Sequence, residues 1–136
     1  MRARQTLAAA GRRSQSSLAP EAPVRAQLQT TVADLPASDP SVRGWHLGIH
    51  PEEPDWGFLA GLRARGGQVS VETFRSAAQP LPPDDLARLL RATDIFSPNA
   101  LSAASLVGDG EPEELARRLL GAGGTVLALR LGARGS

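Results

Sequence analysis

From Gly44 to the C-terminus, short apolar segments alternate with stretches in which apolar side chains recur every three or four positions. The short segments are typical of strands, and the wider spacing is typical of amphipathic helices. The pattern predicts strands at 45–49, 68–73, 94–96 and 125–131. It predicts helices beginning near residues 56, 83, 100 and 112, three of them ended by glycine.

This order of strands and helices indicates an α/β fold. Right-handed connections between successive strands build a parallel sheet flanked by helices, as in Rossmann-type folds. The last strand, 125–131, is nearly all apolar, so we expect it to be buried on both faces. Ligands of such folds bind beyond the carboxyl ends of the strands, which directs attention to the loops after Ile49, Thr73, Phe96 and Leu131.

Residues 1–43 differ from the rest, because they are rich in Arg, Gln, Ser, Ala and Pro and contain no acid before Glu21. Few large apolar side chains occur there, so we expect a poorly ordered segment followed by one domain at 44–136. The Arg and Ser content of the first twenty residues is shared with organelle transit peptides. An ordinary mobile N-terminus on a cytoplasmic protein is the favoured interpretation.

Composition excludes several classes of protein. The 15 basic residues, all of them Arg, and the 14 acidic residues leave a net charge of +1, so charge-driven nucleic-acid binding is not expected. The absence of Cys excludes disulfides, thiolate nucleophiles and Cys-ligated metals. No apolar run approaches the roughly 18 residues that a membrane span needs, so we expect a soluble protein without a membrane partner.

Two histidines and a glutamate are the first candidates for chemistry. His46 and His50, followed by Glu52 and Glu53, have the residue types of a two-His, one-carboxylate metal site. In a strand, however, the two rings lie about 13 Å apart, too far for one ion, so we favour a hydrogen-bonded role and predict no metal site. Glu72 has the chemistry of an acid or base, but no partner stands beside it in sequence.

Glycine-rich turns occur at two places. The run 121–124 follows a helix and precedes a strand, which is the order of a helix C-cap and the reverse of a phosphate loop. The run 131–135 ends a strand in Gly-x-x-Gly, where the backbone can turn tightly and approach a ligand. Upstream, the strand 94–96 enters Ser-Pro-Asn, so that the Asn99 carboxamide is displayed where a ligand would lie.

These features, in this order, resemble the ribokinase or PfkB family of carbohydrate kinases. Members of that family carry a strand ending in a Pro-Asn turn, a helix, a glycine, a second helix, and a strand leading into Gly-Ala-x-Gly. The matching segments here are Ser97-Pro98-Asn99, Leu106-Val107-Gly108, Glu114-Leu115-Ala116 and Leu131-Gly132-Ala133-Arg134-Gly135. The resemblance covers roughly residues 44–136 and implies the central part of a ribokinase-like domain.

The resemblance implies ATP-dependent phosphoryl transfer to a hydroxyl of a sugar or nucleoside, with Mg²⁺ on the phosphates. At the matching positions, Asn99 is expected near the phosphates and a metal-bound water. Arg130, Gly132 and Gly135 are expected to line the nucleotide side of the site.

The chain departs from the family pattern at important positions. Where the family has a Glu three residues after the turn Asn, this chain has Ser102, which cannot supply a carboxylate to Mg²⁺. The run Glu72-Thr73-Phe74-Arg75 matches the family's strand-end Asp, Asn and Arg only loosely. The family's catalytic Asp, in a Gly-Ala-Gly-Asp run after the Gly-x-x-Gly turn, has no counterpart. No catalytic residue is therefore assigned, and we expect a truncated fragment that is inactive alone.

Two alternatives remain open at this point. One is a small non-catalytic α/β module that binds a nucleotide or a partner through the same loops. The other is a nucleotide-binding α/β domain unrelated to sugar kinases, although the sequence has no Gly-x-Gly-x-x-Gly after its first strand. In either case, an incomplete parallel sheet leaves an unpaired edge, through which we expect self-association.

Overall fold

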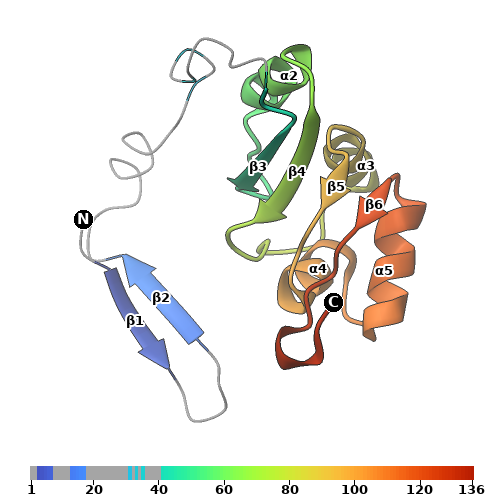
Figure 1. Ribbon diagram of the computed structural model, residues 1–136. Coiled ribbons are helices and arrows are strands. Elements are labelled where there is room, and N and C mark those ends of the chain that lie inside the picture. The colour runs from blue at the N-terminus through green and yellow to red at the C-terminus, as the bar shows by residue number, and fades with distance from the viewer. Residues whose placement is uncertain (1–2, 8–12, 18–30, 32, 34, 36–40) are drawn as a thin grey trace. The chain divides into compact units, whose positions relative to one another are not determined.

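The structure is a computed structural model that describes residues 3–7, 13–17, 31, 33, 35 and 41–136. The chain divides into two units, Met1–Leu35 and Pro36–Ser136. In the first unit, strands β1 (Ala3–Leu7) and β2 (Arg13–Ser17) form an antiparallel pair (Figure 1). This pair was not predicted, because neither segment has the apolar pattern of a strand. Most of the other residues in the segment 1–43, for which low order was predicted, lie outside the described residues.

The second unit contains a four-stranded parallel sheet in the order β3-β4-β5-β6, which confirms the α/β class (Figure 1). Its strands are β3 (Gly44–Ile49), β4 (Gln68–Thr73), β5 (Ile95–Phe96) and β6 (Val126–Leu127). Its helices are α2 (Trp56–Ala64), α3 (Pro83–Arg91), α4 (Ala100–Val107) and α5 (Pro112–Gly121), followed by the 3₁₀ turn η2 (Gly132–Arg134).

One face of the sheet carries the core. On β4, Val69, Val71 and Thr73 are buried, and Ile49 and Phe96 lie buried at the matching positions of the neighbouring strands. The side chains that alternate with them are exposed or only half-buried. The order of the strands in the sheet is the same as their order along the chain. Right-handed connections therefore place the helices on the same face of the sheet. The opposite face is the more open one within residues 41–136.

Local sequence signals set the helix ends. The side chain of Asp55 caps α2 by accepting a hydrogen bond from the Phe58 amide (2.9 Å). After the helix, Gly66 and Gly67 both have a positive φ. At Gly67 a Cβ atom would also lie 2.7 Å from the carbonyl oxygen of Arg43, so glycine is required for the close approach as well as for the turn.

The prediction for the last strand was too long and too buried. Only Val126–Leu127 joins the ladder, at the edge of the sheet, and the Val126 side chain is 50% exposed. The ladder is short because β5 contributes only two residues before Pro98, which has no N–H to donate. No helix in the described part of the chain is both long and apolar enough to cross a membrane.

Candidate functional site

The Pro-Asn turn and the strand that leads into the Gly-x-x-Gly turn lie side by side at the carboxyl edge of the sheet. Asn99 and Arg130 form an isolated parallel β-bridge beyond the ends of β5 and β6. The Arg130 amide donates to the carbonyl of Pro98 (2.9 Å), and the Ala100 amide donates to the carbonyl of Arg130 (3.1 Å). Backbone hydrogen bonds therefore join the two segments that the sequence singled out.

Asn99 is the N-cap of α4. Its backbone is extended (φ −80°, ψ 167°), and its Oδ1 accepts a hydrogen bond from the Ser102 amide (2.8 Å). Asn is among the best N-cap residues because its oxygen satisfies an amide that the helix leaves without a partner. Asn99 is nevertheless exposed, and the helix cap uses only Oδ1, so the Nδ2 donor takes no part in the cap.

Gly132 and Gly135 bracket the η2 turn. Both adopt a positive φ, +64° and +87°, and a Cβ atom at either position would meet nothing within 4 Å. The turn is closed by a hydrogen bond from the Leu131 amide to the Gly135 carbonyl (2.6 Å) and by one from the Gly135 amide to the Gly132 carbonyl (3.0 Å). Backbone conformation, and not crowding, therefore requires glycine at these two positions, and the space beside them is open.

Glu72 and Arg130 form an ion pair across the sheet, 58 residues apart in sequence. The side chains are partly exposed, 30% for Glu72 and 46% for Arg130. His46 is the third member of this group, with Nε2 at 3.9 Å from Glu72 Oε1 and Nδ1 at 3.1 Å from Ser70 Oγ. The sequence did not reveal these partners of Glu72, because they come from β3 and from the segment after β6.

The two histidines have separate surroundings. His50 Nε2 accepts a hydrogen bond from Arg75 (3.4 Å), and its ring meets the edge of Phe74 at 5.8 Å between centroids. His46 instead contacts Ser70 and Glu72. Within the residues that the structure describes, no group of three His, Asp or Glu side chains is placed to hold a metal ion.

The glycine run 121–124 ends α5. The amide of Gly124 donates to the carbonyl of Leu119 (3.2 Å), and Gly123 has a φ of +120°. These are the features of a helix C-cap, as the order of elements predicted. This run takes no part in the site at the carboxyl edge.

The residues present suit phosphate better than Mg²⁺. Two cations are found here: Arg130 follows β6, and Arg134 lies in η2. A guanidinium offers five N–H donors, and a single carboxylate can use only some of them. Ser102, at the position of the family's magnesium-organising Glu, is 2% exposed and lies inside the first turn of α4. Glu72, the carboxylate nearest to Arg130, is occupied by that ion pair. A magnesium ion therefore has no evident protein ligand among these residues.

Comparison with known proteins gives no relative: no family model matches the chain, and no curated protein sequence matches it.

Proposed function

We propose that residues 44–136 are the central part of a ribokinase-like, PfkB-type domain, and that they bind the phosphate groups of ATP at the carboxyl edge of the sheet. The four residues of this site are Asn99, Arg130, Gly132 and Gly135. The observation that carries the proposal is the β-bridge between Asn99 and Arg130, which joins the Pro-Asn turn to the segment that enters the Gly-x-x-Gly turn.

The chemistry at this edge supports an anionic ligand. Arg130 and Asn99 supply side-chain N–H donors, and the two glycines leave open space beside a turn of backbone. In parallel α/β sheets the region beyond the carboxyl ends of the strands is where ligands bind. A nucleotide that enters here meets donors from three features: the turn before α4, Arg130 after β6, and η2.

The same residues do not support phosphoryl transfer by this chain. Deprotonation of an acceptor hydroxyl requires a general base within hydrogen-bond reach. The carboxylate at this edge, Glu72, is paired with Arg130, and Ser102 is buried in α4. We therefore propose nucleotide binding without turnover, with sugar or nucleoside as the acceptor class of the parent family.

Isothermal titration calorimetry of the whole chain with ATP, in the presence and absence of Mg²⁺, tests the proposal. The informative variant is Gly132→Val, which strains a positive φ and fills the open space at the site. Its matched control is Gly66→Val, since Gly66 also has a positive φ and empty surroundings but lies before β4, at the opposite edge. The expected result is ATP binding that survives removal of Mg²⁺, is lost in Gly132→Val and persists in Gly66→Val. A folded wild-type chain that does not bind ATP would contradict the proposal.

A further inference from the structure

The loops after β3 and β4 enclose a pocket that is separate from the residues assigned above. It has a volume of about 270 Å³ and also borders the first turns of α2 and α3. Like the nucleotide site it lies at the carboxyl edge of the sheet, but over β3 and β4 instead of β5 and β6. None of Asn99, Arg130, Gly132 and Gly135 lines it.

Apolar and polar groups both line this pocket. Its apolar residues are one aromatic, one leucine and four prolines, namely Trp56, Leu81, Pro51, Pro54, Pro80 and Pro82, and its polar residues are Glu52, Gln79 and Asp85. Proline has a fixed φ, so walls of this kind change little when a ligand enters. Two hydrogen bonds hold the loops in place: the Ala78 amide donates to Glu52 Oε1 (2.9 Å), and the Leu81 amide donates to the carbonyl of Leu106 (3.1 Å).

The charged side chains that line the pocket are negative. Glu52 and Asp85 line it, and both are exposed. The two segments that build it, 51–62 and 76–87, contain five acids and no Arg, Lys or His. The nearest basic residue along α3 is Arg88, whose guanidinium already lies 4.0 Å from the centroid of the Trp56 ring. That contact shows that the indole accepts a positive charge in this setting.

We propose that this pocket binds a small organic cation, an ammonium or guanidinium group carried on an apolar body. The apolar body fits between the proline walls and Trp56, and the positive group faces Glu52 and Asp85. Aromatic rings together with carboxylates are the combination that recognises such cations, whereas an anion would face the two carboxylates that line the pocket. The nucleotide site is formed by different loops and binds a ligand of opposite charge, so the two proposals are independent.

Three probes of similar size and different charge test this inference: benzylamine as the cation, benzyl alcohol as the neutral compound and benzoate as the anion. Trp56 fluorescence reports binding in a Trp45→Phe background, because the chain contains only two Trp residues. We expect a saturable change with benzylamine that weakens as salt is added, and no saturable change with the other two. Absence of a saturable change with benzylamine, or equal binding of benzyl alcohol, would overturn the inference.

Two neighbouring acids in the first turn of α3 provide a matched pair. Asp85 lines the pocket, whereas Asp84 does not. We expect Asp85→Asn to weaken benzylamine binding by about three- to fivefold, the effect of removing one partly exposed charge partner. Glu52→Gln should act similarly, because the glutamine Oε1 still accepts from Ala78 while the charge is removed. Asp84→Asn should leave the affinity within about twofold, since its charge is screened by solvent. Equal losses in Asp84→Asn and Asp85→Asn would show that the pocket is not the binding place.

Discussion

The carboxylate of Glu72 at the end of β4 pairs with the guanidinium of Arg130 beyond β6, so the ion pair crosses the intervening strand β5. Adjacent strands lie about 4.8 Å apart, so the pair spans two such spacings, which only long side chains can do. Both side chains lie on the more open face of the sheet, where His46 approaches the same carboxylate. The negative charge of Glu72 therefore acts directly on the cation that we assign to the phosphates.

This relationship predicts opposite effects on nucleotide binding. Glu72→Gln removes a negative charge beside Arg130, so ATP affinity should rise by about three- to fivefold, whereas Arg130→Gln should lower it by a similar or larger factor. Calorimetric titration of ATP into both variants measures the two changes. The stability effect should be small, because coupling energies of exposed pairs are about 0.2–1 kcal/mol in double-mutant cycles. Lower ATP affinity in Glu72→Gln would contradict the assignment of Arg130.

Asn99 has two roles that substitution can separate. Asn99→Ala removes the cap of α4 and should lower the free energy of unfolding by about 0.5–2 kcal/mol, measured by urea denaturation. Asn99→Asp keeps a capping oxygen, and a negative charge is favourable at a helix N-terminus, so stability should be retained. The same charge repels phosphate, so ATP affinity should fall by more than about tenfold. Unchanged ATP binding in folded Asn99→Asp would mean that Asn99 is a helix cap only.

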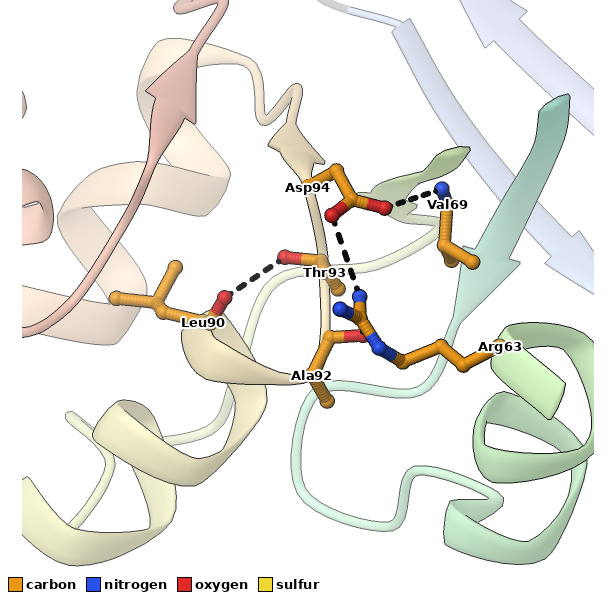
Figure 2. Close-up of polar contacts among 6 residues, drawn as sticks. All are labelled: Arg63, Val69, Leu90, Ala92, Thr93 and Asp94. Carbon is orange, nitrogen blue, oxygen red and sulfur yellow. Dashed lines mark hydrogen bonds and ion pairs between the residues drawn. The ribbon is translucent and has the colours of Figure 1, made fainter. Parts of the chain in front are cut away.

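Asp94 anchors the start of β5 on β4. Its Oδ2 accepts a hydrogen bond from the amide of Val69 (2.7 Å), and its Oδ1 lies 3.4 Å from Arg63 (Figure 2). The Val69 side chain is fully buried, and so Asp94→Ala leaves an amide in the core region without this partner. The expected loss is about 1–3 kcal/mol in the free energy of unfolding, measured by urea denaturation.

Two control variants identify the cause of that loss. Asp94→Asn keeps one acceptor oxygen for Val69. Arg63→Gln removes the exposed ion pair with Asp94 and a hydrogen bond to the Ala92 carbonyl (3.3 Å). Each should cost no more than about 1 kcal/mol. If Arg63→Gln were as damaging as Asp94→Ala, the contacts of Arg63 and not the Val69 hydrogen bond would be the stabilising ones.

Elements with strong local signals could be predicted from the sequence. The strand at 68–73 has the predicted bounds, and α4 begins at Ala100 as predicted. Gly67 immediately before the strand and Gly108 immediately after the helix limit the choice of end point there. The N-cap of α2 at Asp55 and the end of α5 before the positive-φ Gly123 follow from local rules in the same way. The predicted extent and burial of the last strand were wrong. Both depend on how far the neighbouring strand pairs with it and on its place at the sheet edge, and the apolar run itself shows neither.

The candidate site could be predicted only in part. The turns at Asn99 and at Gly132–Arg134 are local, and the α/β order of elements brings them to one edge. The partner of Glu72 is 58 residues away and the second partner is on β3, so no spacing rule could find either. The pocket over β3 and β4 lies between the loops after Ile49 and Thr73, two of the positions where the α/β order predicts ligands. Its lining residues were not predicted, because the proline content of these loops alone suggests only turns.

The most direct test of the nucleotide site follows backbone amide resonances of the ¹⁵N-labelled chain during titration with ATP. We expect saturable shifts for Asn99, Arg130, Gly132 and Gly135, with Gly66 and Gly67 at the opposite edge unchanged. Shifts confined to other residues, or no saturable shift at the four named amides in a folded chain, would contradict the central claim.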